Sequence, residues 1–196
     1  MNDVPLTPEE RQYLLVLARK AITQAASGKR VQRLSPDEGT PRLWEPGAVF
    51  VTLTIGGELR GCIGSLEPRQ PLIEDVVEHA IDAAQNDYRF YPVGPEEVPL
   101  LEIEISRLTI PQPLIYSTPE ELPKRIKPHI DGVVLYDGGR RSTFLPQVWD
   151  TLPKPEDFLD HLCAKMGART DLWRQKVLGA SVYQVEEFRE GQPKTG

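Results

Sequence analysis

The spacing of apolar residues predicts a helix near the start of the chain. Apolar side chains recur at intervals of three and four between residues 14 and 25, which places them on one helical face. Thr7 is a suitable N-cap, Pro8 fits the first helical position, and Glu10 completes a capping box. Gly28 ends the predicted helix.

A change to period two then predicts a β-hairpin. Val49–Ile55 largely alternates apolar and polar positions, and Gly56–Gly57 suits a two-residue turn with positive φ. Glu58–Ile63 is the predicted returning strand. Glycine weakens a strand, so Gly61 and Gly64 indicate a bulge or a close approach of another backbone.

Further elements follow in the order helix, strand, hairpin, helix and strand. Their predicted ranges are 71–86, 101–106, 132–145 around the turn Asp137–Gly139, 155–166 and 181–188. A shift of the apolar positions at Arg107–Ile110 predicts a bulge there. Hairpins dominate over βαβ repeats, so we expect an α+β fold with a mainly antiparallel sheet flanked by helices.

Composition narrows the class of protein. The net charge of −6 and the acidic pI near 5.2 argue against non-specific nucleic-acid binding, because such binding depends on neutralising phosphates. No apolar run approaches the roughly 18 residues of a membrane span. Met1–Pro5 shows no signal-peptide pattern, and two distant cysteines form no disulfide framework. We therefore expect a cytoplasmic protein that does not bind membranes.

Cys62 is the strongest candidate for chemistry. It lies between Gly61 and Gly64, where exposed backbone amides would form an anion cradle beside a nucleophilic thiol. A tightly packed structural cysteine has the same local sequence. Arg60, two residues earlier, projects to the same strand face because side chains alternate, and it would favour the thiolate. Cys163 lies in the apolar stripe of a predicted helix, so we assign it to the core.

The remaining ionisable patterns are weaker. Glu102 and Glu104 share one strand face. Paired carboxylates suit acid–base catalysis, but alternation on a solvated sheet face gives the same pattern. Asp75, His79 and Asp82 share one helical face, which we interpret as solvated surface. Neither Cys-x-x-Cys nor His-Glu-x-x-His occurs, so no metal site is predicted.

Several segments together resemble the AMMECR domain family. The sequence Leu-Arg-Gly-Cys-Ile-Gly of Leu59–Gly64 is similar to the hallmark motif of that family. The resemblance continues in Asp87–Pro92, Leu101–Leu108, Gly132–Tyr136 and Leu145–Val148. It implies one AMMECR-type domain over residues 1–196, with a smaller subdomain and with the motif in a cleft between the two parts. We expect the segments around 29–48 and 111–130 to contribute that subdomain.

The resemblance also implies partners and leaves the reaction open. Microbial members look like protein A of a system that includes a Memo-like protein and a radical S-adenosylmethionine (radical SAM) enzyme. The family often has histidine before the glycine at Gly132, whereas this chain has Asp131, so a histidine at that position is not available to Cys62. The cofactor, the reaction class and the oligomeric state are not specified by the sequence.

Two hypotheses follow from these residues. In the first, the chain is an enzyme or enzyme component that binds a small molecule around Cys62. The residues expected to contact that molecule are Arg60, Gly61, Gly64, Asp87, Arg89 and Glu104. In the second, the chain is a non-catalytic binding or scaffold module that uses Tyr88, Phe90 and Tyr91 as its contact surface. Nucleic-acid binding is a distant third.

Overall fold

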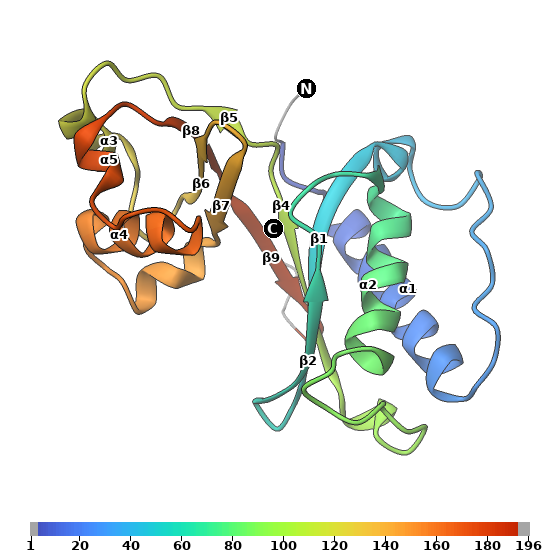
Figure 1. The fold of residues 1–196 in the computed structure, drawn as a ribbon. Helices are drawn as coiled ribbons and strands as arrows, with labels where there is room; N and C mark the ends of the chain where they lie inside the picture. Colours follow the sequence, from blue (N-terminus) through green and yellow to red (C-terminus); the bar gives the residue numbers. More distant parts are fainter. Residues whose placement is uncertain (1–3, 192–196) are drawn as a thin grey trace. The chain divides into compact units, whose positions relative to one another are not determined.

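The computed structural model describes residues 4–191 and divides the chain into two compact units (Figure 1). Unit 1 contains the chain up to Leu108 and again from Glu186, and unit 2 is the continuous segment Thr109–Val185. Each unit combines helices with an antiparallel sheet, which confirms the α+β class. Residues 1–3, at the start of the segment examined for a signal peptide, lie outside the described residues.

Unit 1 is a sheet with strand order β2-β1-β4-β9, and helices α1 and α2 pack on one face of it (Figure 1). β1 pairs antiparallel with both β2 and β4, and its first residues also pair with the short β3. The elements are α1 (Pro8–Ala26), η1 (Pro41–Trp44), β1 (Pro46–Ile55), β2 (Glu58–Gly64), β3 (Gln70–Pro71), α2 (Leu72–Gln85), η2 (Val98–Leu100), β4 (Glu102–Leu108) and β9 (Val185–Arg189).

The predicted start of α1 is confirmed. The Thr7 hydroxyl accepts the amide of Glu10 at 3.2 Å, and the Glu10 carboxylate accepts the amide of Thr7 at 3.0 Å. This capping box satisfies two amides that otherwise lack intrahelical partners. After Ala26 the chain turns at Gly28, whose φ of 65° is the left-handed conformation that glycine adopts without strain.

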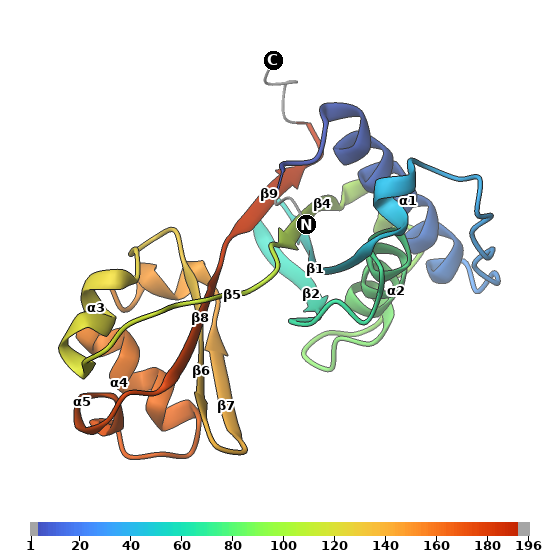
Figure 2. The same cartoon turned by 90° about the horizontal axis from the view of Figure 1, so that it is seen from above.

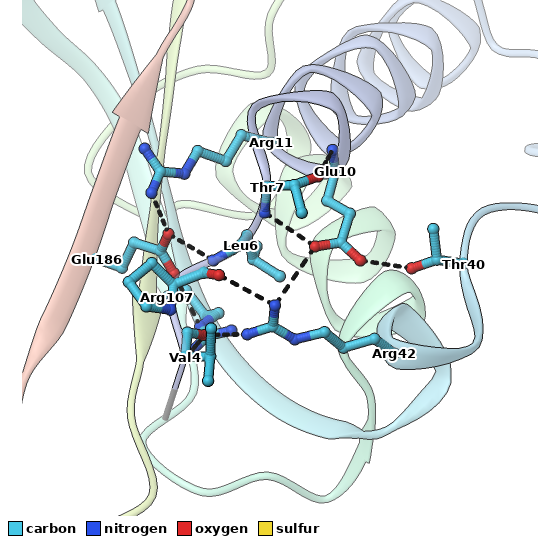
Figure 3. A network of polar contacts seen from close by, with 10 residues as sticks. Val4, Leu6, Thr7, Glu10, Arg11, Thr40, Arg42, Arg107 and Glu186 are labelled. Carbon is cyan, nitrogen blue, oxygen red and sulfur yellow. Dashed lines mark hydrogen bonds and ion pairs between the residues drawn. The ribbon is translucent and has the colours of Figure 1, made fainter. Parts of the chain in front are cut away.

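A network of charged side chains joins the beginning of α1 to β4 and β9 (Figure 3). Glu186 accepts the amide of Leu6 at 2.9 Å and lies 2.8 Å from a guanidinium nitrogen of Arg11. Arg107 approaches the other oxygen of Glu186 at 3.2 Å. Nearby, Arg42 donates to the carbonyl of Pro5 at 3.0 Å. The network therefore fixes the entry into α1 against the sheet.

Arg107 also explains why the predicted bulge at Arg107–Ile110 is wrong. The β1–β4 register continues without a shift from Thr54↔Glu102 to Ala48↔Leu108. By alternation, Arg107 occupies the same face as Ile103 and Ile105, and it is buried there because its charge is paired within the network. The apolar pattern changes because an arginine replaces a hydrophobic residue, while the strand itself stays regular.

Unit 2 is a second antiparallel sheet, with strand order β5-β8-β6-β7 (Figure 2). Its core includes Trp149 stacked on Phe158, with ring centroids 3.8 Å apart, and the fully buried Cys163. The elements are β5 (Gln112–Pro113), η3 (Pro119–Glu121), α3 (Leu122–Arg125), β6 (Gly132–Asp137), β7 (Arg140–Phe144), η4 (Pro146–Asp150), α4 (Pro155–Lys165), α5 (Leu172–Gln175) and β8 (Gly179–Tyr183).

Two features of the chain differ from the sequence pattern. The strand expected at 181–188 consists of β8 and β9, which belong to different sheets and are separated at Gln184. The segments around 29–48 and 111–130, expected in one subdomain, fall into unit 1 and unit 2 respectively. Leu34 and Leu43 pack against the core of unit 1, which accounts for the position of the first segment. Among residues 4–191, no helix is both long and apolar enough to cross a bilayer.

Candidate functional site

Cys62 lies on β2, at the edge of the unit 1 sheet, just after a β-bulge. The β1–β2 register pairs Thr54 with Leu59 but Leu53 with Gly61, so Arg60 is an extra residue without a partner in β1. This bulge places Cys62 opposite Thr52. A bulge is one of the two features that the glycines of this strand predict, and the other is a close approach of another backbone.

Both motif glycines are required by close packing, which was the other predicted reading. A Cβ atom on Gly61 would lie 2.1 Å from the carbonyl oxygen of Ala83 in α2. A Cβ atom on Gly64 would lie 2.4 Å from the Phe50 ring and from the Val49 carbonyl oxygen. The glycines therefore let β2 approach α2 and let Phe50 lie against the strand.

Three polar side chains form a row across the sheet. The vacant side-chain position of Gly61 points toward α2, so the neighbouring Cys62 points to the opposite face. Thr52 shares that face, and its hydroxyl donates a hydrogen bond to the Cys62 sulfur at 3.3 Å. Glu104 of β4 is the next cross-strand partner of Thr52. We call Cys62, Thr52 and Glu104 the cross-strand row.

The backbone of Cys62 is held by a side-chain pair from the loop after α2. The Asp87 carboxylate accepts the Cys62 amide at 2.9 Å, and Arg89 donates to the Cys62 carbonyl at 3.1 Å. Arg89 also binds both oxygens of Asp87, at 2.9 and 2.6 Å. The predicted anion cradle is therefore wrong at its central position, because the amide of Cys62 already binds a carboxylate.

Asp87 is strongly stabilised as an anion. The hydrogen bonds from Arg89 hold the pKa of the Asp87 carboxyl well below its usual range, although burial acts in the opposite direction. The backbone amides of Cys62 and Arg89 add to the lowering. The pair of Asp87 and Arg89 supplies the edge of β2 with the donor and acceptor that a further strand would otherwise offer.

Arg60 is directed to a different partner from the one expected. Its guanidinium donates to both oxygens of Glu97, at 2.8 and 3.0 Å, and the hydrogen bonds from Arg60 lower the pKa of Glu97. Two cations lie near the Phe90 ring, whose centroid is 6.0 Å from Arg60 and 5.5 Å from Arg89. The bulge at Arg60 thus ties β2 to the segment before η2, and Arg89 is the arginine that contacts Cys62.

Glu104 differs from the other carboxylates of the site. Burial raises the pKa of its side chain, and the negative charge of Glu187 adds to this effect, against a smaller lowering by Arg189. A carboxyl whose pKa moves toward neutrality is suited to general acid–base work. This distinguishes Glu104 from Glu102 on the same strand, which is exposed.

The interpretation of Asp75 and His79 as solvated surface is wrong. Both are buried, and the His79 ring lies 3.2 Å from an Asp75 oxygen. Asp75 also accepts the Val49 amide at 2.9 Å and the Gln70 side-chain amide at 3.0 Å, so it joins α2 to β1 and β3. Within residues 4–191, no group of three or more histidine, cysteine, aspartate or glutamate side chains is arranged to hold a metal ion.

Asp131 has a local structural role in unit 2. Its carboxylate accepts the Lys127 amide at 2.9 Å, and its carbonyl accepts the indole N–H of Trp149 at 2.7 Å. Asp131 therefore closes the loop before β6 and anchors a core tryptophan. These hydrogen bonds explain how an aspartate fits the position where the AMMECR domain family often has histidine.

The structure brings only some of the expected site residues together. Asp87 and Arg89 both bind the backbone of Cys62, while Arg60 pairs with Glu97. Gly61 and Gly64 pack against α2 and Phe50, and Glu104 lies opposite Thr52. Sequence reasoning missed Thr52 and Glu97. The alternation of β1 already placed Thr52 on the polar face, but only the bulge sets it opposite Cys62.

Comparison with known proteins agrees with this fold. Residues 15–188 match the AMMECR1 family, and the chain belongs to that family. A protein of Thermofilum pendens is 40% identical over 96% of this chain and 93% of its own length. One from Methanothermobacter thermautotrophicus is 38% identical over 97% and 99%. The crystal structure of the uncharacterized protein PH0010 from Pyrococcus horikoshii is similar at a TM-score of 0.77. It is 36% identical, with 96% of this chain and 95% of that chain covered.

Proposed function

We propose that this chain is an enzyme or enzyme component that binds a small molecule at the cross-strand row, with Cys62 as its nucleophile or covalent carrier. The observation that carries the proposal is the position of the thiol. Cys62 is half-buried and accepts a hydrogen bond from Thr52, whereas the chain's other cysteine is fully buried in a hydrophobic core. Reactive cysteines are partly exposed and lie near positive charge, which Arg89 supplies at the carbonyl of Cys62.

The surrounding residues have defined roles in this proposal. Asp87 and Arg89 hold the backbone of Cys62. Gly61 and Gly64 allow β2 to pack closely against α2 and Phe50. Arg60 fixes the neighbouring loop through Glu97. Glu104 supplies a carboxyl for proton transfer.

The decisive experiment compares the native protein with Cys62→Ser. Both are purified from the same host, and metabolites that remain bound are identified by native mass spectrometry. We expect a small molecule that accompanies the native protein and is lost from Cys62→Ser, while Cys163→Ser retains it. Cys62→Ala should also fail to complement a deletion strain. Normal ligand retention and complementation by the Cys62 variants would contradict the proposal.

A second candidate function is a non-catalytic module that binds other proteins. Tyr88 and Tyr91 are 93% and 92% exposed, on either side of the half-buried Phe90. Tyrosines are enriched in protein interfaces, so this loop is a plausible contact surface. The partners implied by the resemblance are a Memo-like protein and a radical SAM protein.

The two functions make different demands on the chain. A double Tyr88→Ser and Tyr91→Ser variant should lose co-purification with a Memo-like protein if the module hypothesis holds, while Cys62→Ala should keep it. Fast labelling of Cys62 by iodoacetamide near neutral pH favours the enzyme, and labelling only after unfolding favours the module.

A further inference from the structure

Thr52 is the only side chain that the described structure shows in hydrogen-bond contact with the Cys62 sulfur. Its hydroxyl lies 3.3 Å from the sulfur and acts as the donor. The other close groups bind the backbone of Cys62: the Asp87 carboxylate at the amide and the Arg89 guanidinium at the carbonyl.

The pairing of β1 with β2 places the Thr52 hydroxyl next to the Cys62 sulfur. The amide and carbonyl of Cys62 bind Asp87 and Arg89, so they point away from β1. Thr52 and Cys62 therefore form a non-hydrogen-bonded pair of the antiparallel ladder, the type in which opposite side chains lie closest. Threonine is also stiff at χ1, because it is branched at Cβ. The hydroxyl is thus held beside the sulfur at little entropic cost.

The charged groups around Cys62 bind its backbone or lie beyond Thr52, whereas Thr52 donates to the sulfur itself. Asp87 brings a negative charge to the amide of Cys62, and the positive charge of Arg89 is shared with Asp87. Glu104 adds a carboxyl on the far side of Thr52, with Glu187 and Arg189 near it. Arg60 is bound to Glu97. A hydrogen bond donated directly to sulfur stabilises the thiolate relative to the thiol.

We propose that Thr52 is a positioning residue for Cys62, whose hydroxyl stabilises the thiolate and fixes the direction of the sulfur on the sheet face opposite α1 and α2. The inference rests on the proposed function in one respect, namely that Cys62 works as a thiolate. It adds a residue that lies outside the Leu59–Gly64 motif.

The test is the pH dependence of Cys62 alkylation in the full-length protein. Iodoacetamide labelling is followed by peptide mass spectrometry, so that Cys62 is read separately from Cys163. Thr52→Val replaces the hydroxyl by a methyl group of similar size. We expect its rate midpoint to move to higher pH, and its rate near neutral pH to fall about two- to tenfold, the range that one lost hydrogen bond accounts for. The plateau rate at high pH should remain the same.

Two controls separate this effect from altered folding or access. Thr52→Ser restores the hydroxyl and should return the midpoint to the native value. Thr54→Val makes the same substitution on the same face of β1, opposite Leu59, and should leave the midpoint unchanged. If Thr52→Val is poorly folded, Thr52→Ala provides the same loss of the hydroxyl.

An unmoved midpoint in Thr52→Val would overturn the inference, and so would a lower plateau with the native midpoint, since that would reflect access alone. The result is independent of ligand retention. A moved midpoint together with a fully functional Cys62→Ala variant would refute the proposed function and leave the role of Thr52 intact.

Discussion

At the scale of single residues, the site depends on side chains that hold the backbone of Cys62. Asp87 is only 4% exposed and binds the amide of Cys62 and the guanidinium of Arg89 together. A buried carboxylate with these partners contributes more than a surface ion pair, because its removal leaves a buried amide and a cation without an acceptor. The loop and the strand edge therefore depend on one carboxyl group.

Replacing Asp87 with asparagine should lower the free energy of unfolding by about 1–3 kcal/mol, because the asparagine NH2 would face a hydrogen-bond donor where a carboxylate oxygen now accepts. Urea denaturation at neutral pH measures this. The folded-state pKa of Asp87 is depressed, so its contribution is present above the unfolded pKa of about 3.9 and is lost as the pH falls toward the folded value. Asp82→Asn is the control on the adjacent helix. Equal stability of Asp87→Asn and the native protein would contradict the argument.

Gly61 gives a second prediction at this scale. An alanine there would place its Cβ 2.1 Å from the carbonyl oxygen of Ala83, so β2 must move away from α2. We expect Gly61→Ala to reduce the free energy of unfolding by about 1–3 kcal/mol, the usual cost of overpacking. Thermal unfolding provides the measurement. Gly139→Ala is the matched control, because a Cβ atom there meets no neighbour within 4 Å. Similar losses in both variants would show that packing against α2 is not the cause.

At the scale of elements, the sequence predicted more of the fold than of the site. The capping box of α1 and the glycine turn of the first hairpin have local signals, and both are observed. The glycines of β2 predict a bulge or a close backbone approach, but they do not specify that Arg60 is the extra residue. A regular ladder from the turn would pair Thr52 with Gly61, and the extra residue shifts this pairing to Cys62. The cross-strand row, and the departure of Arg60 toward Glu97, follow from that one residue.

The burial of Asp75 and His79 was missed for a related reason. On sequence alone their spacing is that of a solvated helical face, whereas the Val49 amide at the start of β1 needs an acceptor and Asp75 provides it. The tertiary position of β1 overrides the helical pattern. Polar residues on an amphipathic helix are thus assigned correctly only when the strand that covers them is known.

The pair of Asp75 and His79 predicts a pH-dependent link between α2 and the sheet. Burial alone would lower the pKa of His79, but the hydrogen bond and the charge of Asp75 outweigh it and raise the pKa. The resulting stabilisation is complete below the unfolded pKa of about 6.5 and is lost as the pH rises through the folded value. We expect native stability, relative to His79→Gln, to decrease as the pH rises from below about 6.5 through the raised pKa of folded His79.

Urea denaturation across this pH range tests the link. The exposed His161, whose ring lies within hydrogen-bond distance of the Asp157 carbonyl of its own helix, provides the control His161→Gln. The control should follow the native pH profile. If His79→Gln also follows the native profile, the His79 charge makes no net contribution to folding.

At the scale of the whole molecule, the two units differ in how the chain builds them. Unit 2 is one continuous segment with its own buried core around Trp149 and Phe158. Unit 1 is discontinuous, because β9 returns from the end of the chain to complete its sheet. Phe188 is buried in the unit 1 core, and Glu186 binds Arg11 and the amide of Leu6. A separate core is the usual condition for independent folding.

We therefore expect residues 109–185 to fold when expressed alone, and a chain ending at residue 184 to lose the stability of unit 1. The fragment should show dispersed amide signals in NMR spectra and a cooperative thermal transition, because its hydrophobic cluster is formed within the segment. The truncated chain should retain that transition while its unit 1 signals weaken, since it lacks Glu186 and Phe188. The double variant Glu186→Gln and Phe188→Ala provides a full-length comparison with the same expected loss. An unfolded 109–185 fragment, or a truncated chain with native unit 1 signals, would show that the division into units does not describe how the protein is stabilised.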